Sequence, residues 1–209
     1  MNDPEIRALL YPLLQHEGVY VDELPTGTTR ADVVHITPTF MHGYEVKGDG
    51  DTLKRVPAQL KCYGVVYDMV TFVVTEKHVE KLLPMLPEWV GVLVATAEGL
   101  RPHRPARYNA TVERAHLAGL LLCEEVQQFL MNTGLKGASK LRRRELVRIL
   151  AQSHSIPLSG LAQYVRERLI ARMPQRMQNR AERKAERQRL AELRRKRKRK
   201  KAVTPTRRR

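Results

Sequence analysis

Two neighbouring stretches decide the fold: Arg30-Ala-Asp-Val-Val-His-Ile36 and Gly43-Tyr-Glu-Val-Lys47. Both are rich in β-branched and aromatic residues, and turn residues separate them, so they predict two strands of a meander. Residues i and i+2 of a strand project to the same face. The side chains of Glu45 and Lys47 should therefore point together, with Asp32 beside them on the antiparallel neighbour.

Helical and strand periodicity continue on both sides of these stretches. Apolar spacing predicts a first helix that Pro12 kinks or ends early. The expected order of elements is α-β-β-β-α-β-α-β, which is an α/β fold with a mixed sheet of the α+β kind. The predicted helices span 3–15, 52–67 and 76–83, and the predicted strands span 19–24, 30–37, 40–47, 69–75 and 89–96.

The second half of the chain changes in composition, toward helix formers and positive charge. Three further helices are predicted over 112–131, 140–153 and 158–171. Residues 172–209 carry 18 Lys and Arg against three Glu. Such a segment should be disordered, or helical only when its charges are neutralised. We expect three parts: a domain at 1–100, a helical subdomain at 101–171 and a basic tail at 172–209.

The composition excludes several classes of protein. The chain has 209 residues, a formal net charge of +16 and two cysteines, Cys62 and Cys123, too few for a disulfide scaffold. It has no apolar run long enough to span a bilayer and no signal-peptide pattern at its start. We expect a cytoplasmic protein, associated with the nucleoid of a prokaryotic or phage-infected cell. A basic segment of this kind favours nucleic acid as the partner.

Asp32 and Glu45 form a candidate metal site. Two carboxylates that converge favour a hard divalent cation such as Mg²⁺ or Mn²⁺. A neighbouring lysine, here Lys47, can act on a metal-bound water or offset phosphate charge. The alternative is an ordinary exposed ion pair between Glu45 and Lys47. The apolar residues around them argue against it, because charges are rarely buried without a partner.

The next predicted helix adds Gln59 and Tyr63, which share one helical face; a core position for Tyr63 is the alternative. Asp32, Glu45-x-Lys47 and Gln59-x-x-x-Tyr63, in the order strand, strand, helix, resemble the PD-(D/E)XK nuclease superfamily. The similarity is closest to its RecB-like branch, and to a family of small uncharacterised bacterial and phage-borne nuclease-like proteins.

The resemblance covers roughly residues 1–100 and implies a restriction-endonuclease-like αβββαβ core. It implies that Asp32 and Glu45 bind the metal, that the Val46 carbonyl adds a ligand, and that Lys47 is the catalytic lysine. Glu5 is the candidate for a further acidic ligand on the first helix. Ala31 stands where the superfamily often has a proline before the metal-binding Asp.

The predicted function is hydrolysis of DNA phosphodiester bonds by a metal-dependent endo- or exonuclease. RNA remains an alternative substrate. A non-catalytic nucleic-acid binder on a nuclease fold, or a dimeric junction resolvase or recombination subunit, are alternative functions. Residues 120–150 are similar to SAP-type DNA-binding modules, although a plain helical subdomain would have the same pattern. The basic residues expected to contact nucleic acid are Lys54, Arg55, Lys140, Arg142, Arg143, Arg144, Arg194, Arg195, Lys196, Arg197, Lys198, Arg199, Lys200 and Lys201.

Overall fold

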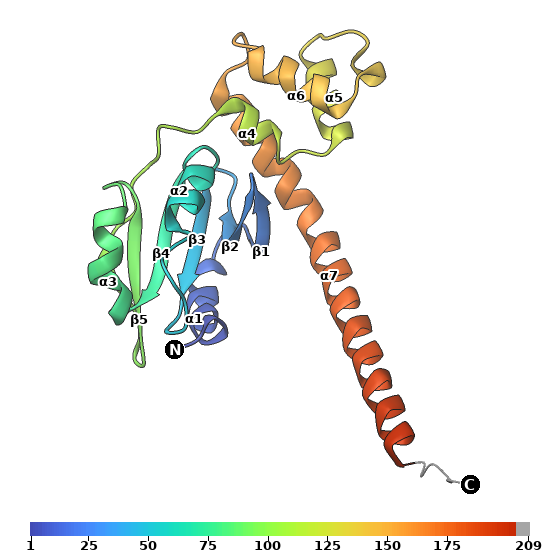
Figure 1. The fold of residues 1–209 in the computed structure, drawn as a ribbon. Helices are drawn as coiled ribbons and strands as arrows, with labels where there is room; N and C mark the ends of the chain where they lie inside the picture. The colour runs from blue at the N-terminus through green and yellow to red at the C-terminus, as the bar shows by residue number, and fades with distance from the viewer. Residues whose placement is uncertain (204–209) are drawn as a thin grey trace. The chain divides into compact units, whose positions relative to one another are not determined.

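A computed structural model describes residues 1–203 of the protein (Figure 1). Residues 204–209 lie outside the described part, as do the side chains of residues 176, 177, 180, 184 and 196–203. The chain divides between residues 171 and 172 into two compact units. No helix in the described part is apolar and long enough to cross a bilayer.

The first unit is built on a six-stranded mixed sheet with strand order β1-β2-β3-β4-β5-β6. The central pairs β3/β4 and β4/β5 are parallel, and the outer pairs are antiparallel. The predicted mixed α+β fold is thereby confirmed. The strands span Val19–Thr26 (β1), Thr29–Ile36 (β2), Met41–Lys47 (β3), Met69–Thr75 (β4), Gly91–Thr96 (β5) and Gly99–Arg104 (β6).

Helices cover both faces of this sheet. On one face, α1 (Asp3–Leu10) packs Ile6 and Leu10 against Tyr44 and Val46 of β3. The alternate residues of β3 face α2 (Val56–Gly64), which begins at Val56 because Pro57 fits the first helical turn. Crossovers between successive parallel strands are right-handed, so α3 (Glu76–Leu82) lies on the same face as α2. The face of the sheet that carries Glu45 and Lys47 is therefore the one that α2 and α3 cover.

One glycine allows close packing in the middle of β3. A Cβ atom at Gly43 would come within 2.6 Å of the Tyr67 ring. Tyr67 is fully buried, and its hydroxyl bonds to the side chain of Thr26 in β1. The small residue at 43 thus lets a large aromatic ring lie against the strand, two residues before Glu45.

The second half of unit 1 is helical. The expected helix over 112–131 is two helices, α4 (Arg114–Ala118) and α5 (Cys123–Asn132), because Gly119 ends the first one. A short 3₁₀ turn, η3 (Ala138–Lys140), leads to α6 (Arg143–Gln152), and the last helix is α7 (Leu158–Val203). The buried Arg166 of α7 donates from Nε to the Pro38 carbonyl at 2.9 Å and lies 3.7 Å from Asp68.

Further differences from the sequence analysis lie at the first helix, at the edge of the sheet and in the last helix. The first helix ends at Leu10, before Pro12, which continues as a 3₁₀ turn, η1 (Tyr11–Leu14). Strand β6 was not predicted, and it carries the sheet beyond residue 100. Helix α7 does not end at residue 171 but continues through 203. Residues 178–193 consist almost entirely of strong helix formers such as Ala, Glu, Gln, Arg and Leu, which accounts for the extension.

Candidate functional site

The candidate site begins where β2 and β3 part. The pairing of these strands runs from Ile36–Met41 to Val33–Tyr44. At the next position along β2, the Asp32 carboxylate accepts the backbone N–H of Val46 at 2.9 Å through Oδ2. The Asp32 side chain thus replaces the backbone carbonyl that would accept this N–H if the strand pairing continued. A carboxylate therefore lies between the two strands at the point where they separate.

Glu45 is the hub of the site. Its Oε1 accepts Lys47 Nζ at 2.6 Å and also the amide of Gln59, while its Oε2 accepts the Tyr63 hydroxyl at 2.7 Å. Glu45 and Lys47 are each only 1% exposed. The alternative of an exposed surface ion pair is therefore wrong. The structure also brings Gln59 and Tyr63 to the strand pair, as their helical spacing indicates.

Tyr63 is both a core residue and part of the site. It is fully buried, and its hydroxyl lies 2.9 Å from the Arg30 carbonyl as well as close to Glu45. Burial raises the pKa of Tyr63, and the negative charge of Glu45 raises it further. The phenol therefore stays protonated and acts as a donor, so Tyr63 is a core residue that also contacts Glu45.

The negative charge of Asp32, the second carboxylate of the site, is only partly compensated by its neighbours. The side chain of Asp32 is 24% exposed, more open than Glu45. The pKa of Asp32 is raised to about 7, first by burial and then by the charge of Glu45. The Val46 N–H, Arg7 and Lys47 oppose this rise without cancelling it. Additional positive charge placed beside Asp32 would therefore be favourable.

Arg7 of α1 is a site residue that the sequence analysis missed. Its Nη1 donates to the Asp32 carbonyl at 2.7 Å, and its Nη2 lies 3.2 Å from Asp32 Oδ1. Nε of the same guanidinium bonds to Asp3, one helical turn earlier. The i, i+4 spacing of Asp3 and Arg7 was the only available signal, and it indicates a helix-surface ion pair rather than a contact with β2.

Glu5, the expected further acidic ligand, lies in the N-terminal cap of α1. Its carboxylate accepts the Asn2 N–H at 2.8 Å, and Asn2 in turn accepts the Glu5 N–H. This reciprocal pair is a capping box, which satisfies two free donors at the start of α1. The structure thus engages Glu5 in the helix cap, outside the contacts that join Asp32, Glu45 and Lys47.

The oxygen atoms at the site fit a hard divalent cation that keeps several waters. Asp32 and Glu45 supply two carboxylates, and the buried Gln59 Oε1 has no hydrogen-bond partner in the described part of the chain. Among the described residues, no group of three or more His, Cys, Asp or Glu side chains is placed to hold a metal ion. A cation here would therefore rely on two carboxylates, on neutral oxygens such as the Val46 carbonyl, and on water, as Mg²⁺ commonly does.

The basic residues that are predicted to contact nucleic acid are mostly exposed where the structure describes their side chains. Lys54 and Arg55 are exposed in the turn before α2. Lys140, Arg142 and Arg144 are exposed around the start of α6, whereas Arg143 also bonds to the carbonyls of Gly119 and Leu121. Arg194 and Arg195 are exposed on α7. The side chains of six further predicted contacts lie outside the described residues: Lys196, Arg197, Lys198, Arg199, Lys200 and Lys201.

Comparison with known proteins gives two matches. A protein-family model described as bacteriophage P4 protein cII matches residues 9–203. A solved structure of a protein of unknown function from Silicibacter pomeroyi is similar at 19% identity and a TM-score of 0.41, over 74% of this chain and 87% of that one. No curated protein matches.

Proposed function

The chain belongs to the bacteriophage P4 protein cII family, and we propose that it acts as a metal-dependent nuclease that hydrolyses phosphodiester bonds of DNA. The observation that carries the proposal is the cluster of the partly exposed Asp32 with the buried Glu45 and Lys47 on two neighbouring strands. The resemblance to the PD-(D/E)XK superfamily, which rests on the same residues, supports it.

The burial of this cluster is difficult to explain by stability alone. Desolvating an ion pair costs several kcal/mol per ion, and a well-packed apolar pair of similar size is often at least as stable. The side chains of Gln59 and Tyr63 both donate hydrogen bonds to the one carboxylate of Glu45. Several buried polar side chains around one charged group are typical of functional sites, where a charge must be held in a fixed position and orientation.

Each residue has a distinct task in the proposed reaction. Asp32 and Glu45 would hold Mg²⁺ or Mn²⁺, which supplies Lewis-acid charge at the phosphate and a more acidic water. The Lys47 ammonium donates to Glu45 and would orient the attacking water or offset the charge of the phosphate. Tyr63 and Gln59 keep the Glu45 carboxylate in place, and Arg7 does the same for Asp32.

The basic second half of the chain would bind the substrate. An acidic site attracts a cation but repels DNA, so a separate source of positive charge is needed. Residues 172–209 carry 18 Lys and Arg, and α6 exposes Arg142 and Arg144 at its start. Contacts of this kind are made mainly to phosphates and do not depend on sequence. We infer association with the nucleoid from the same charge.

The decisive experiment is a cleavage assay with labelled single-stranded, duplex and branched DNA, and with RNA, in Mg²⁺, Mn²⁺ or EDTA. We expect metal-dependent products that Glu45→Gln abolishes. Glu80→Gln, the same change at an exposed residue of α3, is the matched control and should cleave normally. DNA binding without cleavage of any substrate, in either metal, would instead identify a non-catalytic binder.

A further inference from the structure

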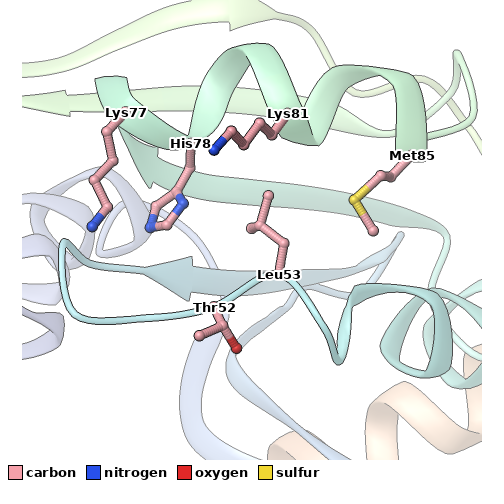
Figure 2. Close-up of a pocket in the computed structure, with 6 residues that line it drawn as sticks. All are labelled: Thr52, Leu53, Lys77, His78, Lys81 and Met85. Atoms are coloured by element: carbon pink, nitrogen blue, oxygen red, sulfur yellow. The ribbon is translucent and has the colours of Figure 1, made fainter.

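A cavity of about 540 Å³ lies between α3 and the loop that follows β3 (Figure 2). It lies outside the Asp32–Glu45–Lys47 cluster, and none of the residues that line it is acidic. Its volume falls in the range of sites that take small organic ligands. The lining residues are Thr52, Leu53, Lys77, His78, Lys81 and Met85.

The cavity has a cationic end and an apolar end. In Figure 2, Lys77, His78 and Lys81 lie toward one end, and the side chains of Leu53 and Met85 lie on opposite sides of the other. Met85 is 36% exposed although it is apolar. A ligand that fills both ends would combine an anionic group with an apolar body, because each end stabilises one of these parts.

The two lysines are not equally engaged. Lys77 Nζ donates to the backbone carbonyl of Asp49. Lys81 has no ion-pair partner within the described residues and lies one helical turn farther along α3. His78 is buried and its Nε2 is 2.9 Å from the Gly48 carbonyl, so the imidazole fixes the loop against the helix. Lys81 is therefore the cation most available to an incoming anion.

The cavity adjoins the catalytic end of β3. Gly48, which His78 contacts, directly follows Lys47 in the chain. Lys47 is also in register with Val74 of β4, two residues before α3 begins. Both relationships place the cavity at the end of β3 that carries Lys47.

We propose that the cavity binds one nucleotide of a single strand, next to the point of cleavage. Its phosphate would contact Lys81 and Lys77, and its base would lie between Leu53 and Met85. A base stacked inside a duplex cannot present its face to these side chains, so the cavity selects an unpaired strand. This inference rests on the proposed nuclease function and adds a substrate class to it.

The phosphate contact can be tested by binding alone, with the full chain in EDTA so that no cleavage occurs. The probe is a fluorescent single-stranded oligonucleotide, and the readout is anisotropy across a salt series. Lys81→Gln should lower the affinity about threefold to tenfold and reduce the slope of log affinity against log salt by about 0.7. Lys61→Gln, the same change at an exposed residue of α2 that does not line the cavity, is the matched control. Equal slopes for the two variants would overturn the phosphate contact.

The base contact needs a second pair of changes. An oligonucleotide series with one abasic position moved along the strand should show one position where the base matters for the wild-type chain. Met85→Ser should lower affinity for the intact strand and remove the sensitivity at that position. If Met85→Ser keeps the full sensitivity, the base does not lie against Met85. Duplex DNA of the same length should be insensitive to Met85→Ser.

A free nucleotide is the other source of the same chemistry. Titration calorimetry with deoxyadenosine monophosphate and with inorganic phosphate separates the two sources. Heat with the mononucleotide that Lys81→Gln removes, together with no effect on the oligonucleotide, would overturn the strand proposal in favour of a free ligand.

The outcomes also separate this inference from the nuclease proposal. Cleavage that proceeds normally while Lys81→Gln and Met85→Ser bind like wild type would refute the cavity alone. Loss of binding in both variants, with no cleavage of any substrate, would support the cavity and refute hydrolysis.

Discussion

The Asp32 carboxylate accepts a hydrogen bond from the backbone N–H of Val46 at 2.9 Å, and so joins β2 to β3 where the pairing of the two strands ends. The contact has a structural part, one accepted hydrogen bond, and an electrostatic part, one negative charge beside Glu45. An asparagine can keep the first and remove the second. Asp32→Asn therefore separates the fold from the chemistry more cleanly than Asp32→Ala.

We expect Asp32→Asn and Glu45→Gln to fold and to lose metal-dependent cleavage by a factor of about 100 or more, because each removes charge that would hold the cation. Calorimetric titration with Mn²⁺ should show weaker binding in both variants. Lys47→Ala should keep most of the metal affinity and lose turnover. Full activity in all three variants would refute the site.

The hydrogen bond between Tyr63 and Glu45 should be visible in stability. Tyr63→Phe leaves Glu45 Oε2 without this donor, at a cost of about 1–3 kcal/mol. Tyr63→Ala also creates a cavity in the core and should cost about 3–5 kcal/mol. Urea denaturation of the metal-free protein measures both. Wild-type stability in Tyr63→Phe would show that the hydroxyl is not needed at Glu45.

His42 should make the protein sensitive to acid. Burial and, to a smaller extent, the charge of the neighbouring His35 lower the pKa of His42 to about 3. Between about 6.5 and 3 the unfolded chain binds a proton that the folded protein does not, so stability falls as the pH falls through this range. The slope contributed by His42 approaches about 1.4 kcal/mol per pH unit.

The measurement is a denaturation series from pH 7.5 to 4.5, with His42→Gln as the comparison. The variant retains a hydrogen-bonding group toward Thr71 but has no ionisable ring. Its stability should depend less steeply on pH than that of the wild type. Parallel pH curves would mean that His42 accepts a proton in the folded state.

Removal of residues 178–209 should weaken nucleic-acid binding and leave the first unit folded. The truncated chain keeps Met173, because this side chain is fully buried. The truncated chain loses most of its basic tail, so the slope of log affinity against log salt should become shallower. Cleavage at saturating DNA should persist. An unchanged slope would assign the positive charge to another acidic partner.

Much of the site could be predicted because it depends on short-range spacing. The i, i+2 relation of Glu45 and Lys47 and the i, i+4 relation of Gln59 and Tyr63 each place two side chains on one face, whatever the rest of the chain does. The contacts in the structure agree with both. The turn residues around the meander likewise determined that β2 lies next to β3.

Other features depend on tertiary placement and leave little trace in the sequence. Arg7 reaches Asp32 only because α1 packs across β3. Strand β6 is an edge strand with Pro102 and a largely exposed pattern, so it lacks the alternation by which strands are recognised. The cavity beside α3 unites residues from two segments whose charges, seen separately, are typical of a solvated surface.

Arg166 connects the first turns of α7 to the start of β3, the strand that carries Glu45 and Lys47. It lies 3.7 Å from Asp68 Oδ2, and the same oxygen accepts the backbone N–H of Met41, the first residue of β3, at 2.7 Å. Undocking of α7 would leave Asp68 buried without its counter-charge and loosen this amide. The hydrogen-exchange rate of the Met41 backbone amide should therefore report whether the first turns of α7 are docked. Nuclear magnetic resonance can measure this rate without an attached label.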